Sequence, residues 1–127
     1  MQDMAAQFAR AKYLNLESFR KSGAGVRTPV WFAEETGPAT VFYVYSEADA
    51  GKVKRIRNNP KVRIAPCNFR GSLRGAWIEG RARTCGADEA AHGQQQLRKK
   101  YGVPKIVADF FARIARHKNV VIAIEFS

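Results

Sequence analysis

The chain has 127 residues, 46% of them hydrophobic, and a formal net charge of +11. This length suits one hydrophobic core rather than two, so we expect residues 1–127 to form a single domain. No apolar run approaches the roughly 20 residues needed to cross a bilayer, and the first residues lack the pattern of a secretory signal. We therefore expect a cytoplasmic protein that makes no membrane contact.

The first half of the chain predicts a short helix followed by three antiparallel strands. The alanine-rich segment Asp3–Ala11 favours a helix that packs on a barrel end or a partner subunit. The strands are expected at Tyr13–Arg20, Val26–Phe32 and Ala39–Tyr45, with a hairpin turn at Lys21–Gly25. Pro29 has no backbone N–H to donate, so its strand should be at an edge, bulged or open to a ligand there.

A basic segment connects the third strand to a fourth at Val62–Cys67. Ser46 and Asp49 resemble a capping box, which predicts a helix from about residue 47 to Asn58-Asn59-Pro60. Between Ala50 and Ile78 there is no acidic residue, but the segment holds Lys52, Lys54, Arg55, Arg57, Lys61, Arg63, Arg70 and Arg74. A helix start with this charge favours an anion, most naturally a phosphate. A solvated basic face is the alternative explanation.

The second half predicts a fifth strand, two helices and a last strand. Ala76–Arg83 alternates small and large residues and follows an exposed loop at Asn68–Gly75. Gly86–Tyr101 predicts a largely solvated helix, and Lys105–Arg116 predicts an amphipathic one. Val120–Phe126 is almost entirely apolar, so we expect a strand buried on one face by a barrel interior and on the other by a subunit interface.

Residues that carry chemistry are sparse. His92 and His117 have no cysteine or carboxylate at metal-ligand spacing and are predicted to lie at the surface, while Cys67 and Cys85 are predicted to be packing residues. No metal site, nucleotide-binding loop or nucleophile motif is legible, and no pair of carboxylates is placed across a cleft. If the chain is an enzyme, a bound cofactor should therefore carry the reaction.

Two strings in this order of elements resemble one protein family. Thr28–Phe32 (TPVWF) and Gly51–Pro60 (GKVKRIRNNP) are similar to motifs of the split β-barrel flavin and deazaflavin oxidoreductases related to pyridoxamine 5′-phosphate oxidase, in particular the branch of coenzyme F-420-dependent enzymes. The similarity extends from about Lys12 to Phe126. It implies a mainly β fold with helices, a six-stranded antiparallel split barrel of the FMN-binding type.

The resemblance also implies a homodimer with two cofactor sites at its interface. The positions that match the ring-binding strand are Thr28, Pro29, Val30 and Trp31. Ser46 matches a position near the cofactor phosphate, Lys52 matches the residue that grips it, and Arg55 matches a further basic position. The FMN-binding branch often has Arg-Lys where this chain has Gly51-Lys52, and an arginine where Thr28 falls. This difference favours F-420, whose anionic tail suits a basic surface, over FMN.

The resemblance and the charge leave three functions open. The first is an oxidoreductase that transfers a hydride between bound F-420 or FMN and a small organic substrate, with no obligatory acid or base side chain. The second is a protein that binds nucleic acid or another polyanion, although no nucleic-acid-binding motif is legible. The third is a split barrel that binds a flavin or haem without catalysis.

Overall fold

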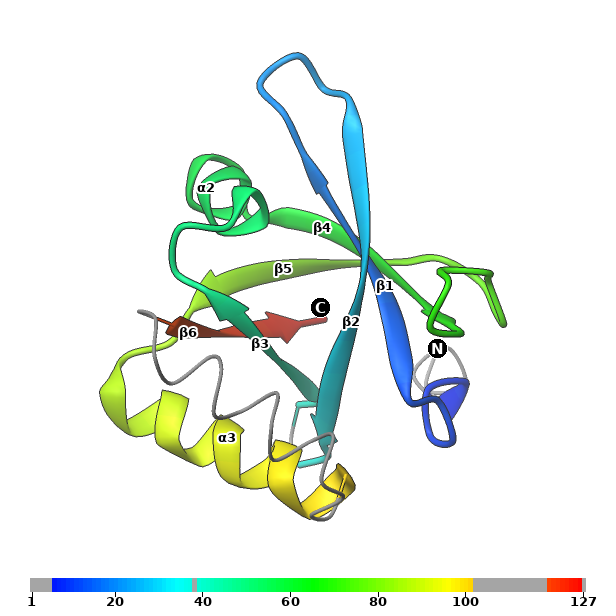
Figure 1. Cartoon of the computed structure of the whole chain (residues 1–127), viewed down its shortest axis with the longest axis vertical. Helices are drawn as coiled ribbons and strands as arrows, with labels where there is room; N and C mark the ends of the chain where they lie inside the picture. The colour runs from blue at the N-terminus through cyan, green and yellow to red at the C-terminus, as the bar shows by residue number, and fades with distance from the viewer. Residues whose placement is uncertain (1–5, 38, 102–118, 127) are drawn as a thin grey trace.

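The computed structural model of the chain describes residues 6–37, 39–101 and 119–126. Six antiparallel strands close into a barrel in the order β1-β2-β3-β6-β5-β4 (Figure 1). The strands are β1 (Tyr13–Phe19), β2 (Gly25–Glu35), β3 (Val41–Glu47), β4 (Lys61–Cys67), β5 (Ile78–Thr84) and β6 (Asn119–Glu125), and the helices are α2 (Gly51–Asn58) and α3 (Ala87–Tyr101). The predicted six-stranded antiparallel barrel is confirmed. In these ranges, neither helix is long and apolar enough to cross a bilayer.

The core follows from alternation along the strands, because every second side chain of a strand points to the same face. Each strand contributes inward residues to one cluster: Leu14 and Leu16, Val30 and Phe32, Phe42 and Val44, Val62 and Ile64, Ala82, and Ile122 and Ile124. In β5 the inward position at Gly80 must stay small, since a Cβ there would lie 2.9 Å from the carbonyl oxygen of Glu125.

Two segments outside the strands complete this core. The described part of the predicted Asp3–Ala11 helix forms turns that bury Phe8, whose ring meets Phe42 edge-on at a centroid distance of 4.9 Å. Helix α2, on the opposite side of the barrel in Figure 1, contributes buried Val53 and Ile56. The expectation that the N-terminal segment packs on the barrel is confirmed for Phe8.

Helix α3 packs against β2, β3 and β6. The helix lies close to the sheet at Gly93, where a Cβ would lie 2.8 Å from Val121 Cγ1 and 3.0 Å from Tyr43 Cδ1. The prediction of a largely solvated helix holds for most of α3, but Gly93 and Leu97 on one face are buried. Within the described residues this helix, rather than a subunit interface, covers the outer face of β6, because Val121 and Ala123 are buried there.

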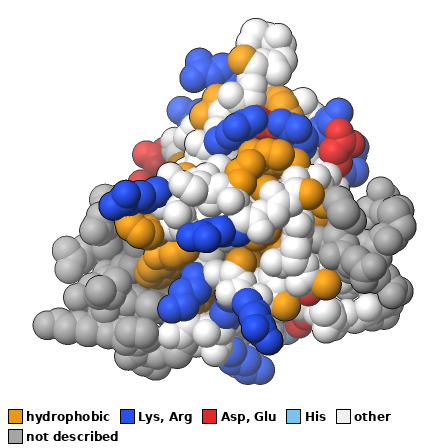
Figure 2. Space-filling view, turned by 90° about the vertical axis from the view of Figure 1, so that its right-hand side faces the viewer, with side chains coloured by type: hydrophobic (Ala, Val, Ile, Leu, Met, Phe, Trp, Pro, Cys, Tyr) orange, Lys and Arg blue, Asp and Glu red, His pale blue; other side chains and the backbone are white. Residues whose placement is uncertain are grey.

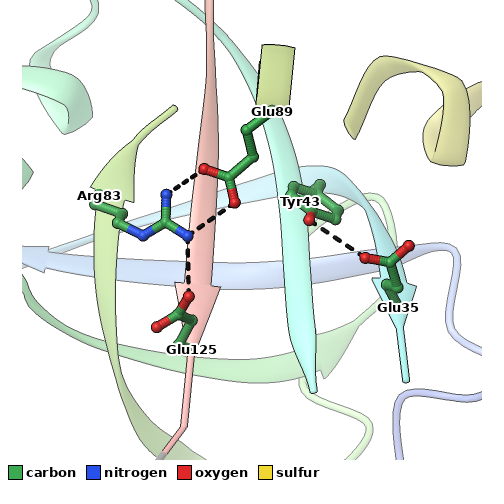
Figure 3. Close-up of polar contacts among 5 residues, drawn as sticks. All are labelled: Glu35, Tyr43, Arg83, Glu89 and Glu125. Atoms are coloured by element: carbon green, nitrogen blue, oxygen red, sulfur yellow. Dashed lines mark hydrogen bonds and ion pairs between the residues drawn. The ribbon is translucent and has the colours of Figure 1, made fainter. Parts of the chain in front are cut away.

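An arginine connects α3 to the barrel through charge (Figure 3). Arg83 of β5 donates hydrogen bonds to both carboxylate oxygens of Glu89 in α3, and its Nη2 also lies 2.9 Å from Oε1 of Glu125 in β6. Hydrogen bonds from Arg83 hold the pKa of the Glu89 carboxyl below its ordinary value, although burial opposes this. The start of α3 is therefore held to two neighbouring strands.

His92 provides a second polar connection, which the sequence did not predict. Its side chain is 42% exposed, in line with the surface position expected, but its Nε2 lies 2.5 Å from Oε2 of Glu35, 57 residues away in the sequence. The Tyr43 hydroxyl donates to the other Glu35 oxygen at 3.4 Å (Figure 3). Spacing along the chain could not reveal this pair, because the barrel alone brings β2 and α3 together.

The structure describes some of the residues in the remaining predictions and not others. Cys67 and Cys85 are both free thiols, and Cys67 is buried, as expected for packing residues. The described residues contain no cluster of histidine, cysteine and carboxylate side chains that could hold a metal. The predicted helix Lys105–Arg116 and His117 lie outside the described residues.

Candidate functional site

The sheet splits where β2 changes partners. Residues Gly25–Trp31 of β2 pair with β1, whereas only Phe32–Glu35 pair with β3, and that ladder begins at the pair Phe32 and Val44. The end of β3, from Tyr45 to Glu47, pairs with β6 on its other side. The facing edges of β2 and β3 therefore separate beyond this point. Pro29 lies on this edge, as its missing N–H predicted.

A pocket of about 400 Å³ occupies the split, and we call it pocket 1. It is lined by Tyr13, Thr28, Pro29, Val30, Trp31, Tyr45, Ser46, Glu47, Ala50 and Lys52. The β2 edge forms one wall, the end of β3 forms another, and the first turn of α2 closes one end. This volume is in the range of small-molecule sites, which run from about 300 to 1,000 Å³.

The structure brings together six of the seven residues that the sequence nominated. Thr28, Pro29, Val30 and Trp31 line pocket 1 from β2, and Ser46 and Lys52 line it from β3 and α2. Arg55 is not in the lining. Its Nε instead donates a 2.7 Å hydrogen bond to the Ser18 hydroxyl in β1.

Helix α2 begins later than predicted. Its first residue is Gly51, no side chain caps it, and the Ser46 hydroxyl donates to the carbonyl of Glu47 instead. The reason is that β3 runs on to Glu47 through its pairing with β6, so Ser46 is a strand residue. The predicted capping box is therefore wrong, and the first turn of α2 contains no acidic residue.

Positive charge accumulates at the α2 end of pocket 1. Burial lowers the pKa of Lys52, and the nearby charge of Arg55 lowers it further, while Glu47 opposes the shift. Burial and the charge of Arg20 lower the pKa of Arg55 in the same way. In the described part of the chain neither Lys52 nor Arg55 forms an ion pair within 4 Å. A bound anion would relieve both effects, since opposite charge favours the protonated form.

The opposite end of pocket 1 is aromatic. Trp31 stacks on Tyr101, the last residue of α3, with ring centroids 5.4 Å apart and planes 27° from parallel. The Tyr101 hydroxyl accepts a hydrogen bond from the Phe32 N–H at 2.9 Å and lies within donating distance of the carbonyls of Phe32 and Lys12. Because a tyrosine has one hydroxyl proton, the two carbonyls share it. Tyr101 thus fixes α3 to β2 next to the pocket wall.

Replacing Tyr101 with phenylalanine should therefore destabilise the protein by about 1–2 kcal/mol, because the buried Phe32 N–H loses its partner while the ring stack on Trp31 remains. Urea unfolding followed by circular dichroism measures this. Tyr13→Phe is the matched control, since the Tyr13 hydroxyl forms no hydrogen bond with a described residue. Equal stability of the two variants would contradict the role given to the Tyr101 hydroxyl.

Sequence reasoning missed part of the lining of pocket 1. Tyr13 and Tyr45 both line it, together with Glu47 and Ala50. A signal for Tyr13 was present, because alternation with inward Leu14 and Leu16 places its side chain on the outer face of β1. Nothing local could show that this face meets the split in the sheet.

Comparison with known proteins yields structural relatives only. No protein-family model and no curated protein sequence matches the chain. A candidate 5-nitroimidazole antibiotic resistance protein from Bacteroides thetaiotaomicron has a TM-score of 0.70 at 16% identity, over 97% of this chain and 77% of its own. A candidate pyridoxamine 5′-phosphate oxidase from Listeria innocua has a TM-score of 0.66 at 16% identity, over 99% of this chain and 93% of its own.

HutZ, the haem storage protein of Vibrio cholerae, is similar to the same extent. Its TM-score is 0.72 at 11% identity, over 99% of this chain and 89% of its own. At these identities the comparisons establish the fold, which is the split barrel of pyridoxamine 5′-phosphate oxidase-like proteins. The proteins that share it include a candidate oxidase and a haem storage protein.

Proposed function

We propose that the chain is an oxidoreductase that binds F-420 or FMN in pocket 1 and transfers a hydride to or from a small organic substrate. The observation that carries this proposal is the position of Lys52. Its side chain is partly buried, has no ion-pair partner among the described residues, and lines the same pocket as the open edge of β2. A phosphorylated planar ring matches both features, since it carries an anion at one end and hydrogen-bonding groups along its edge.

Different residues of pocket 1 would bind the phosphate and the ring of the cofactor. Lys52 would hold the phosphate and Ser46 would lie near it, while Arg55 would add positive potential from outside the lining. The β2 edge from Thr28 to Trp31 would line the ring. When bound, such a cofactor supplies the hydride chemistry itself, and the protein binds it, orients it and excludes water.

We also propose that the protein acts as a homodimer with pocket 1 at the interface. Pro29, on the wall of pocket 1, is exposed. A second copy placed over this wall would cover a bound ring. Light scattering at a concentration above that used for cofactor titration gives the mass, and a monomer with full cofactor affinity would refute this arrangement.

A second candidate function is binding of haem, which the similarity to HutZ favours. The lining of pocket 1 offers the phenols of Tyr13 and Tyr45 but no histidine, cysteine or methionine. Imidazole, thiolate or thioether ligation in this pocket would therefore need a residue from elsewhere. The proposed flavin or deazaflavin needs no such ligand, so the described lining fits it better.

A titration with three cofactors separates these functions. F-420 and FMN are followed by quenching of their own fluorescence, and haemin by its Soret band. The proposal predicts saturable binding of F-420 or FMN, followed by reduction of the bound ring with a chemical reductant and its reoxidation by an electron acceptor. Saturable binding of haemin alone would replace the proposal with the second candidate.

A further inference from the structure

A second cavity of about 390 Å³, which we call pocket 2, lies beyond the aromatic end of pocket 1. Its lining consists of Gln7, Arg10, Ala11, Lys12, Tyr13, Pro66, Cys67, Asn68, Phe69 and Arg74. Tyr13 lines both pockets, and its ring lies 6.5 Å from that of Trp31. The two cavities are therefore neighbours on either side of one tyrosine.

Two sets of hydrogen bonds hold the walls of pocket 2 in place. The side-chain amide of Gln7 donates to the carbonyl of Ala76 at 2.7 Å and accepts from the Ala76 N–H at 2.9 Å, which ties the N-terminal wall to the loop after β4. On the loop, the Asn68 side chain accepts from the N–H groups of Arg70 and Ser72. The wall residues are thus positioned without a ligand.

That ordered loop presents an exposed aromatic ring. Phe69 is 64% exposed, although burial of such a ring is normally favourable. Leu73, which bridges to Cys67 beside the same wall, is 45% exposed. A loop that is held by its own hydrogen bonds and exposes an apolar ring in the lining of a cavity has the form of a binding surface.

The charge of pocket 2 is entirely positive. Arg10, Lys12 and Arg74 line it, the lining contains no carboxylate, and none of the three forms an ion pair with a described residue. Figure 2 views the side of the molecule on which this loop lies in Figure 1, and shows lysine and arginine side chains with hydrophobic ones between them. Aromatic walls with unpaired cations suit a flat anion.

We propose that pocket 2 is a second binding site, which takes an aromatic or conjugated ligand through its carboxylate or phosphate group. Arg10 and Arg74 pair with the anion, and Phe69 and Tyr13 contact the apolar part. Such a ligand lies beside pocket 1 across Tyr13, where a substrate of the bound ring would be placed; this last point alone rests on the proposed function.

The test uses phenyl phosphate and benzoate as probes, with benzyl alcohol as a neutral probe of similar size. Amide chemical shifts of the full chain are followed by NMR without any cofactor. We expect shifts at Gln7, Phe69 and Arg74 and a dissociation constant of about 1 mM, as is usual for so small a ligand. Benzyl alcohol should bind at least about fivefold more weakly, because it lacks the charge. The stronger of the two acids identifies the preferred anion.

Matched arginine variants locate the probe. Arg10→Gln and Arg74→Gln should each weaken phenyl phosphate binding about five- to tenfold. Arg57→Gln removes the same charge from the exposed side of α2, outside both pockets, and should leave the affinity unchanged. Loss of binding in Lys52→Met, with full binding in Arg74→Gln, would place the probe in pocket 1 and overturn the inference.

Two other outcomes would refute the proposal. An equal loss of affinity in all three arginine variants would mean that the probe responds only to the net charge of the protein. Failure of the probe to bind to a dimeric protein would mean that a second copy covers pocket 2. Because the titration needs no cofactor, pocket 2 can bind its probe even where pocket 1 binds no flavin. If the protein binds its cofactor, phenyl phosphate should also bind to that complex. Competition between phenyl phosphate and the cofactor would show that both occupy pocket 1 and would refute the proposal.

Discussion

Replacing Lys52 with methionine should weaken binding of F-420 or FMN about 10- to 150-fold, which corresponds to about 1.5–3 kcal/mol for a charge-assisted phosphate contact. Lys52 lines pocket 1 and is partly buried, so its charge is screened less by water and salt than that of a surface lysine. Methionine keeps most of the side-chain length but removes the charge. The loss should therefore report the phosphate contact and not the shape of the pocket.

Lys54→Met is the matched control for this prediction. Lys54 is two residues away on the same helix, exposed and outside the lining of pocket 1. Fluorescence titration of both variants under the same salt should leave the affinity of Lys54→Met within about twofold of the unmodified chain, as expected for a screened surface charge. Equal losses in the two variants would show that the helix acts only through net charge.

Replacing Glu17 with glutamine should lower the free energy of unfolding by about 2–3 kcal/mol at pH 7. The Glu17 side chain is only 5% exposed, and its carboxylate lies 3.0 Å from Arg27 Nε and 2.5 Å from Arg63 Nη2. Both guanidinium groups also lie over the Trp77 ring, at 4.8 and 5.0 Å. Glutamine would leave two like charges facing each other, and their exposure of 53% and 34% keeps the loss below that of a fully buried pair.

The same pair predicts a dependence on pH. Burial raises the pKa of Glu17, but hydrogen bonds and charge from Arg27 and Arg63 outweigh it, and the net pKa is lowered. A carboxyl whose pKa is lowered by folding stabilises the protein above its unfolded pKa of about 4.3, and this contribution is lost as the pH falls through the folded value. The difference between the native chain and Glu17→Gln should therefore shrink below about pH 4.

Urea unfolding at a series of pH values measures both effects. Glu79→Gln is the control, because Glu79 is 66% exposed and faces Lys61 at 3.4 Å, so its removal should change stability by less than about 0.5 kcal/mol at any pH. A Glu17→Gln variant with the stability of this control, or with a deficit at pH 3 as large as that at pH 7, would contradict the account of the buried carboxylate.

The sequence predicted the strands because they are short runs of β-branched and aromatic residues bounded by turn residues, and the family resemblance implied that they close into a barrel. It placed the strand ends less well. β2 extends to Glu35 and β3 to Glu47 because partners across the sheet, β3 and β6 respectively, continue the ladders. Pairing of this kind depends on residues far away in the chain, and local propensity at Glu34 or Ser46 does not reveal it.

The candidate site could also be predicted only in part from the sequence. Thr28–Trp31 and Lys52 could be nominated from two local strings, and the fold brings them to one pocket. Tyr101 could not be nominated, because its hydroxyl meets Phe32 from 69 residues away. Pocket 2 likewise joins the segment from Gln7 to Tyr13 with the loop at Asn68–Arg74. Contacts between such distant segments arise only from the closure of the barrel.

The central claim is that Lys52 and pocket 1 hold a phosphorylated redox ring, and the most direct test measures how much the phosphate contributes to cofactor affinity. One titration series gives the dissociation constants of FMN and riboflavin, and of F-420 and its phosphate-free ring nucleoside, and the ratio within each pair is this contribution. The account predicts that at least one phosphorylated cofactor binds about tenfold or more tightly than its phosphate-free form. Equal affinity within both pairs, or no saturable binding of any of the four, would contradict it.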